Sequence, residues 1–251
     1  MSASAPPSRA LRRIAVFDVD GTLTLTSAVD DACYIRSVRE EWGVPSMSTD
    51  WSAYEHSTDN AIAAELFRRH RGREASVHEL AALRDRFAGL VRAEADRDPS
   101  LFRPVPGVES ILLGLPGHGW SVAIATGGWT PSARCKLDRA GVPWRELPAA
   151  FACDARPREA IIRIAAQRAA ERSGVAGFER IVYVGDGVWD VRACRTAGFP
   201  FVGVATGERA ERLRREGAGA VLPDYADAAA FLAALDAAQA PTAASRSGAL
   251  A

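Results

Sequence analysis

The chain has 251 residues, of which 48% are hydrophobic and 25% are charged, and its formal net charge is zero. This balance is ordinary for a globular protein with one large domain, or a core domain with an insertion, and it gives no overall field that would attract nucleic acid or an anionic membrane. No apolar run is long enough to span a membrane, and the first 13 residues contain no apolar core of signal-peptide length. We therefore expect a cytoplasmic protein that binds neither nucleic acid nor membranes. Nothing in the sequence indicates an oligomeric state.

Cysteine, histidine and lysine are each scarce. The four cysteines have no CxxC spacing, which is typical of reduced thiols, and the four histidines have no metal-ligand spacing, which argues against a zinc site. Lys136 is the only lysine among 31 basic residues, so arginine is expected to serve almost wherever a catalytic cation is needed.

Short apolar segments alternate with helical patterns over much of the chain. The expected strands are residues 13–18, 121–126, 180–185, 201–204 and 220–222. The expected helices between them are residues 131–140, 157–172, 188–197 and 209–216. This alternation predicts an α/β fold, with a Rossmann-like parallel sheet covered by helices on both faces.

One stretch breaks the alternation. Between about residues 24 and 103 the pattern is helical throughout, with expected helices at 28–41, 60–71 and 77–95, and we interpret it as an inserted all-helical cap domain. The expected organisation is a catalytic core made of residues 13–23 and 105–236, a cap made of residues 24–104, and disordered tails at 1–12 and 238–251.

The first expected strand ends in a pair of carboxylates, Asp18 and Asp20, followed by Gly21. Both carboxylates can reach one reacting centre only if the backbone turns between them, and Gly21 permits that turn. An Asp-Gly turn that merely closes the strand is the simpler alternative for this segment taken alone.

A second acidic pair follows the strand expected at 180–185. Asp186 ends that strand and Asp190 lies one helical turn further along, so both can lie near Asp18 at the same edge of the sheet. Such carboxylates would repel one another without a cation, and oxygen ligands favour magnesium. The alternative for Asp190 alone is a charge favoured by the dipole at a helix N-terminus.

Thr126 ends the strand expected at 121–126 and is followed by Gly127 and Gly128. A hydroxyl and free backbone N–H groups at this position are suited to phosphate oxygens. A plain strand-to-helix turn, with Thr130 as its N-cap, is compatible with this role because it uses different residues.

Together these motifs resemble the haloacid dehalogenase superfamily of phosphohydrolases, its phosphoglycolate phosphatase and β-phosphoglucomutase-like branch in particular. The DxDGT motif matches residues 18–22, the strand-ending Ser or Thr matches Thr126, and GDxxxD matches residues 185–190. The resemblance implies that Asp18 attacks phosphorus and forms an aspartyl-phosphate, while Asp20 acts as acid and then as base. It further implies a Mg²⁺ held by the Asp18 carboxylate, the Asp20 backbone carbonyl, Asp186 and Asp190.

The chain departs from the family where a lysine usually lies near the start of a helix. The local residues are Arg156, Pro157 and Arg158, and an arginine can supply the same charge as a planar fork. We favour Arg158 over Arg156, because R-E-x-I opening a helix resembles a variant within the family. Thr126 and this arginine would bind the transferring phosphoryl group.

The cap is expected to set the choice of substrate. His56 and Thr58 lie in an aromatic-rich loop and could face the phosphate, although Thr58 or a neighbour could serve only as the N-cap of the following helix. Trp51 and Tyr54 are interpreted as cap core rather than ligand contacts.

The sequence therefore predicts a magnesium-dependent phosphatase for a small phosphorylated metabolite, through an aspartyl-phosphate. A phosphomutase acting on a sugar phosphate and a non-catalytic regulatory protein on the same fold remain as alternatives. A dehalogenase is disfavoured because that branch lacks the aspartate found here at position 20, and a phosphonatase because the expected cap contains no lysine for a Schiff base.

Overall fold

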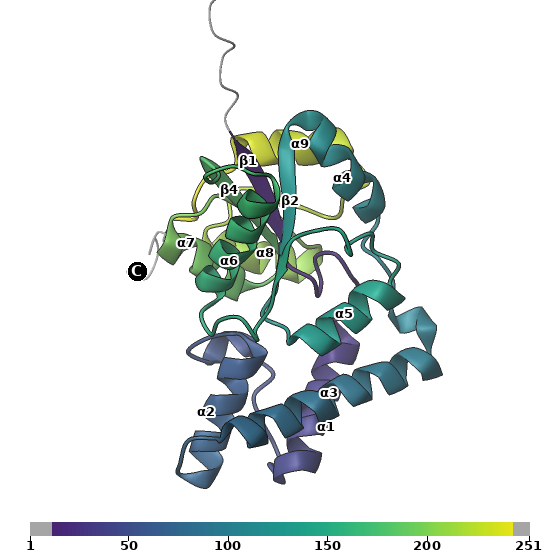
Figure 1. Cartoon of the computed structure of the whole chain (residues 1–251), viewed down its shortest axis with the longest axis vertical. Helices are drawn as coiled ribbons and strands as arrows, with labels where there is room; N and C mark the ends of the chain where they lie inside the picture. Colours follow the sequence, from purple (N-terminus) through teal and green to yellow (C-terminus); the bar gives the residue numbers. More distant parts are fainter. Residues whose placement is uncertain (1–11, 243–251) are drawn as a thin grey trace, which may run out of the picture.

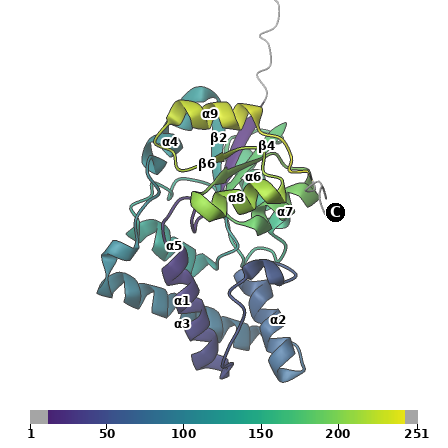
Figure 2. The same cartoon turned by 180° about the vertical axis from the view of Figure 1, so that it is seen from behind.

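A computed structural model describes residues 12–242 of the chain, and it has two lobes. One lobe is a parallel sheet covered by helices, and the other is helical (Figure 1). The same division is visible from behind, where α1 and α2 lie on the far side of the junction from α8 and α9 (Figure 2).

The sheet of the described residues has six strands in the order β3-β2-β1-β4-β5-β6, and every neighbouring pair is parallel. The strands are β1 (Arg13–Phe17), β2 (Trp120–Ala125), β3 (Ala149–Ala150), β4 (Arg180–Gly185), β5 (Phe201–Val204) and β6 (Val221–Leu222). Five of them lie within a residue or two of the expected positions. The sequence did not predict β3, because two alanines carry no strand pattern of their own and pair with β2 only in the tertiary structure.

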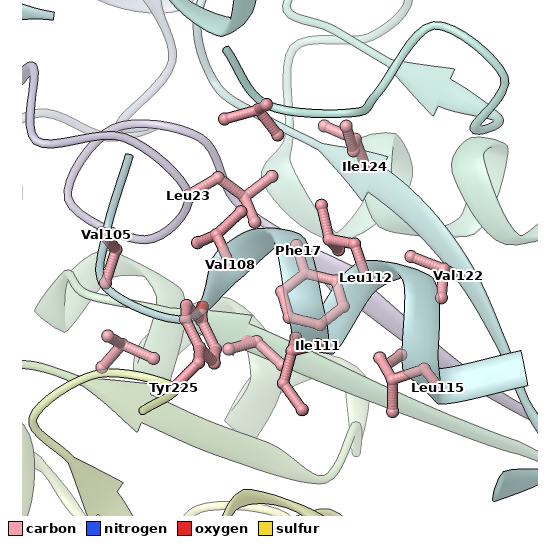
Figure 3. Close-up of a cluster of buried hydrophobic side chains, with 14 of the residues drawn as sticks. Phe17, Leu23, Val105, Val108, Ile111, Leu112, Leu115, Val122, Ile124 and Tyr225 are labelled. Carbon is pink, nitrogen blue, oxygen red and sulfur yellow. The ribbon is translucent and has the colours of Figure 1, made fainter. Parts of the chain in front are cut away.

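Each central strand is buried on both faces, as expected for a parallel sheet. In β1, Ala15 and Phe17 face one core while Ile14 and Val16 face the other. On the first face, α4 (Val108–Gly114) lays Val108, Ile111 and Leu112 over Phe17 (Figure 3). The helix α9 (Ala228–Ala237) completes this core.

The opposite face is covered by α6 (Arg158–Arg172), α7 (Val188–Ala197) and α8 (Gly207–Glu216). These three helices begin within a residue or two of the positions that the sequence predicted. The helices α4 and α9 were not predicted individually.

The helical lobe consists of the following elements. They are α1 (Ser27–Trp42), η1 (Trp51–Ala53), α2 (Asp59–Arg71), α3 (Val77–Arg97) and η2 (Pro99–Leu101). Its apolar core also includes Trp129, at the start of α5 (Thr130–Arg139), so that α5 packs on both lobes. The helix α5 lies between the sheet and α3 in Figure 1.

The two connections between the lobes run side by side. The N–H of Leu25 donates to the carbonyl of Arg103, and the N–H of Val105 donates to the carbonyl of Leu23. The insertion therefore leaves and re-enters the core at one point, where residues 23–25 lie beside residues 103–105.

The expected tails lie mostly outside the described residues, which begin at residue 12 and end at residue 242. Residues 238–242, expected in the C-terminal tail, have defined positions in the structure because the chain lies along β5, where Phe201 N donates to the Gln239 carbonyl (3.1 Å). Among the described helices, none has the length and apolar character needed to cross a membrane.

Candidate active site

A cavity of about 480 Å³ lies between the two lobes, at the carboxyl ends of β1, β2 and β4. Its core side includes Asp18, Asp20, Thr126, Arg158 and Asp186. In open parallel sheets, ligands bind at this edge. The strand ends that the sequence singled out thus meet in one cavity.

The turn after β1 positions its two aspartates at the floor of the cavity. Asp18 is anchored by its N–H, which donates to the Val184 carbonyl of β4 (2.9 Å), and the side chain is buried. Gly21 has a φ of 74°, and a Cβ there would lie 2.0 Å from Asp186 Oδ2. Glycine is therefore required both by the turn and by the close approach of the acidic strand end.

Three carboxylates converge behind this turn. Asp18, Asp186 and Asp190 each place one oxygen within 4.8 Å of the others, and all three are buried. Burial raises the pKa of each: that of Asp190 to about 7, against the opposing effect of Arg158, and that of Asp186 well above its ordinary value, against the opposing effect of Arg209. Asp190 also accepts from the Gly187 N–H (3.0 Å), so it serves the start of α7 as well.

The cluster fits a hard divalent cation. Oδ1 of Asp18 is buried and has no hydrogen-bond partner of normal geometry among the described residues. A cation bound by oxygen ligands would satisfy that atom and relieve the repulsion between the three carboxylates.

The loop after β2 lines the same cavity with Thr126, Gly127 and Gly128. The Thr126 hydroxyl accepts from the Gly128 N–H (3.1 Å), so that N–H is not free as the sequence analysis expected, but the hydroxyl proton remains available for an acceptor. A Cβ at Gly127 would lie 2.4 Å from Arg158 Nη2, so a side chain there would collide with the arginine.

Arg158, and not Arg156, lies at the site. The guanidinium of Arg158 is buried, with Nη1 3.2 Å from Asp18 Oδ2 and 3.1 Å from Asp190 Oδ1, and Nη2 donates to the Ser57 carbonyl of the cap (2.8 Å). The side chain of Arg156 is exposed, because this residue precedes α6. Arg158 occupies the first helical position after Pro157, which directs it to the edge of the sheet.

A second buried cation lies on the opposite side of Asp20. Lys136 is fully buried, and its Nζ donates to Asp20 Oδ2 and to Asp30 Oδ1 of α1. Burial disfavours the charged ammonium, but Asp20, Asp30 and Asp59 outweigh burial and raise the pKa of Lys136. The lysine therefore stays protonated and joins the core to the cap.

Comparison with known proteins identifies the family. The model for haloacid dehalogenase-like hydrolases matches residues 13–198, about three quarters of the chain. The chain belongs to the haloacid dehalogenase-like hydrolases. Two curated relatives are named phosphoglycolate phosphatase: one from Cereibacter sphaeroides is 26% identical, over 77% of this chain and 85% of its own length. The other, from Agrobacterium fabrum, is 28% identical, over 80% of this chain and 83% of its own length.

A solved structure supports the same fold. The crystal structure of a hydrolase from Pseudomonas syringae superposes with a TM-score of 0.68 at 19% identity, covering 88% of this chain and 98% of that one. At this identity the likeness concerns the fold alone, and it includes the helical lobe because nearly the whole of both chains is aligned.

Two residues predicted for substrate binding in this hydrolase lie outside the cavity lining. The hydroxyl of Thr58 donates to the Arg156 carbonyl (2.9 Å), so it ties the cap to the core instead of facing the phosphate or capping α2. His56 is half-buried and does not line the cavity either. From the same loop, Ser57 and Asp59 line the cavity instead.

Trp51 was interpreted as cap core, and this was only partly correct. It packs at the edge of the cap core but also lines the cavity, whereas Tyr54 is buried. His70, His78 and His118 are exposed.

Other charged residues of the cavity were not singled out from the sequence. They are Asp30, Asp31, Asp50, Arg209 and Arg212. Arginine was expected to serve almost wherever a catalytic cation is needed, but Lys136 also reaches the site, from α5 and not from the helix where a family lysine was sought. A signal existed, because the only lysine of an arginine-rich chain lies in the helix that follows Thr126.

Proposed function

We propose that this hydrolase is a magnesium-dependent phosphatase that removes the phosphoryl group from a small phosphorylated metabolite by way of an aspartyl-phosphate on Asp18. The observation that carries the proposal is the convergence of Asp18, Asp186 and Asp190 on one buried point beside Arg158. The naming of curated relatives as phosphatases supports the same reaction class.

Asp18 is suited to the role of nucleophile. One of its oxygens faces Arg158 and the other has no hydrogen-bond partner among the described residues. An Asp18 oxygen would attack phosphorus as the bond from phosphorus to the leaving oxygen breaks. Asp18, Asp186 and Asp190 would hold Mg²⁺, with the backbone carbonyl of Asp20, and the ion would supply positive charge for the phosphoryl oxygens.

Asp20 is suited to proton transfer. Its two oxygens accept from Thr26 (2.6 Å) and from Lys136, which fixes the direction of the carboxyl group at the mouth of the site. Asp20 would give a proton to the leaving oxygen and then take one from the water that attacks the aspartyl-phosphate, releasing inorganic phosphate and regenerating Asp18.

Positive charge and donors for the phosphoryl oxygens would come from Arg158, Thr126 and the Gly127 segment. Phosphoryl transfer needs mainly positioning and neutralisation of charge, which these residues provide at the carboxyl end of the sheet. A cavity of this size beneath a helical cap suits a small metabolite better than a protein or a nucleic acid.

Schiff-base chemistry does not suit this site. The lysine would have to be neutral to attack a carbonyl, but Lys136 is held as a cation by Asp20 and Asp30.

The test is release of inorganic phosphate from p-nitrophenyl phosphate and a panel of metabolites, with and without Mg²⁺. Asp18→Asn, which keeps the shape of the side chain, is expected to abolish magnesium-dependent release, while Asp85→Asn, on the exposed surface of α3, is expected to retain it. The absence of phosphate release from every compound with folded protein and Mg²⁺ would reject the proposal. Isomerisation of a sugar phosphate without net phosphate release would indicate a phosphomutase instead.

A further inference from the structure

The cavity wall has more acidic than basic residues. Seven aspartates line it, against three arginines, and Lys136 reaches it from below. Four of the aspartates, Asp30, Asp31, Asp50 and Asp59, come from the cap side, opposite the reactive end at Asp18. A substrate whose phosphoryl group lies at Asp18 must extend its leaving group toward this acidic side.

The carboxylates of the core side are matched by cations. Asp18 pairs with Arg158, Asp20 with Lys136 and Asp186 with Arg209. Each of these core-side aspartates therefore already has a cationic partner before a substrate binds.

Only some of the aspartates on the cap side have a cationic partner. Asp30 pairs with Lys136, and Asp59 accepts from the Trp129 N–H (2.8 Å). Within residues 12–242, Asp31 and Asp50 form no ion pair: Asp31 accepts from the indole N–H of Trp51 (2.9 Å), and Asp50 accepts from Ser52. Two negative charges at the leaving-group end thus have no cation in contact.

Trp51 is held beside these two carboxylates. Its indole N–H is fixed on Asp31, and its ring packs edge-on against Tyr34 (centroids 5.6 Å apart) and stacks on Tyr54 (6.2 Å). Because these contacts fix the ring at the cavity wall, a π-system lies next to two carboxylates. Aromatic rings with nearby acidic groups are a recurrent environment for ammonium ions.

Among the described residues, no arginine of the cavity lining forms an ion pair with Asp31 or Asp50. Arg158 and Arg209 are engaged by core aspartates. Hydrogen bonds from Ser52 lower the pKa of Asp50, and Arg212 and Arg192 add to this effect without pairing with it. Burial raises the pKa of Asp31, against the opposing effect of the hydrogen bond from Trp51. A carboxylate or second phosphate on the leaving group would therefore face Asp31 and Asp50.

We propose that the substrate is a phosphate monoester whose leaving group carries a protonated amine, bound by Asp31, Asp50 and the ring of Trp51. This inference rests on the proposed phosphatase activity and narrows it to a substrate class. It also separates this chain from its relatives, since phosphoglycolate, the substrate in their name, carries a carboxylate on the leaving group.

Three monoesters of equal length test the inference: phosphoethanolamine, 2-hydroxyethyl phosphate and phosphoglycolate. They differ at the far end only in an ammonium, a hydroxyl and a carboxylate group. The expected order of kcat/KM is ammonium, hydroxyl, carboxylate, with at least about a tenfold difference between the first and the last, since unlike and like charges meet the same aspartates. Values within threefold of one another, or a preference for the carboxylate, would overturn the inference.

Single substitutions test which residues cause the preference for the ammonium ester over the carboxylate ester. Asp31→Asn is expected to reduce the ratio of kcat/KM for the ammonium ester to that for the carboxylate ester about tenfold, because a neutral amide replaces the charge while retaining an acceptor for Trp51. Asp85→Asn removes one acidic charge from the cap outside the cavity and is expected to leave the ratio unchanged. An equal change of the ratio in both variants would show a general field instead of a subsite and would overturn the inference.

Hydrolysis of p-nitrophenyl phosphate distinguishes failure of the substrate-class inference from failure of the phosphatase proposal. Hydrolysis of this compound with no hydrolysis of the three esters would overturn the substrate class and leave the phosphatase proposal standing. No magnesium-dependent hydrolysis of any of the four would reject the phosphatase proposal itself, and the inference with it.

Discussion

Two buried cations lie on opposite sides of the reactive aspartates, and their surroundings differ. The Arg158 cluster (Arg158, Asp18 and Asp190) is built entirely from the core, at the ends of β1 and β4 and the starts of α6 and α7. The Lys136 cluster (Lys136, Asp20 and Asp30) combines the core with α1 of the cap.

The two clusters differ in how strongly their contacts depend on the position of the cap. The ion pairs of the Arg158 cluster join elements fixed by the sheet, although Nη2 of Arg158 also donates to the Ser57 carbonyl of the cap (2.8 Å). The Lys136 cluster exists only while α1 lies against α5, because Asp30 is a cap residue. The Arg158 cluster is thus suited to stabilising the phosphoryl group, and the Lys136 cluster to linking Asp20 with the cap.

The largest expected effect comes from breaking the Arg158 cluster. Arg158→Met removes the charge that faces Asp18 and Asp190, and we expect kcat/KM for p-nitrophenyl phosphate to fall about 10³-fold through lost stabilisation of the phosphoryl group. Arg158→Lys keeps the charge without the planar fork and is expected to retain more activity than Arg158→Met. A loss of less than tenfold in the folded Met variant would contradict the assignment.

Breaking the Lys136 cluster is expected to act first on stability. Lys136→Met leaves Asp20 and Asp30, whose side chains are 21% and 18% exposed, close together without a cation, which we expect to lower the free energy of unfolding by at most about 3–5 kcal/mol. Urea denaturation measures this change. Adding Asp30→Asn in the same chain should recover part of the loss, and a double variant as destabilised as the sum of the two single variants would show that the residues are not coupled.

The effect expected at Asp59 depends on pH. Burial raises the pKa of Asp59 from 3.8 to about 7, opposed by Lys136 and the Trp129 N–H, so between these values the folded chain holds a proton that the unfolded chain has lost. Asp59 therefore reduces stability progressively as the pH rises from about 4 to about 7, at most by about 1.4 kcal/mol per pH unit.

Asp59→Asn removes this titration and keeps an acceptor for Trp129. Its free energy of unfolding, relative to the unmodified chain, should therefore increase from pH 5 to pH 7 and then level off. Denaturation at several pH values, with Asp85→Asn as a control for the loss of a charge, checks this. A relative stability that does not change with pH would contradict the role of burial at Asp59.

The smallest effect is expected at the exposed counterpart of the Lys136 cluster. Arg139, on the same helix, pairs with Asp96 of α3, and the two side chains are 44% and 66% exposed. Arg139→Gln should change the free energy of unfolding by less than about 1 kcal/mol and kcat/KM by less than about twofold. A loss comparable to that of Lys136→Met would show that any core–cap ion pair has the same effect, and the distinction between the clusters would fail.

The sequence by itself determined the sheet and the edge at which the site lies. Apolar runs ending in Asp18, Thr126 and Asp186 predict both the strands and their shared carboxyl edge, because the chain leaves each parallel strand on the same side of the sheet. Spacing along one helix turn likewise indicated that Asp190 belongs with Asp186. These are short-range patterns, which a sequence records directly.

The tertiary structure alone decided which residues of distant segments meet. It brought Lys136 of α5 to Asp30 of α1. It directed the hydroxyl of Thr58 to the Arg156 carbonyl and placed Trp51 in the cavity lining. Each outcome depends on how the cap packs on the core, and therefore on contacts between residues that no local pattern relates. Burial in the folded structure also raises the pKa of the site aspartates, because it removes the water that stabilises their charged form. Composition alone does not reveal this change.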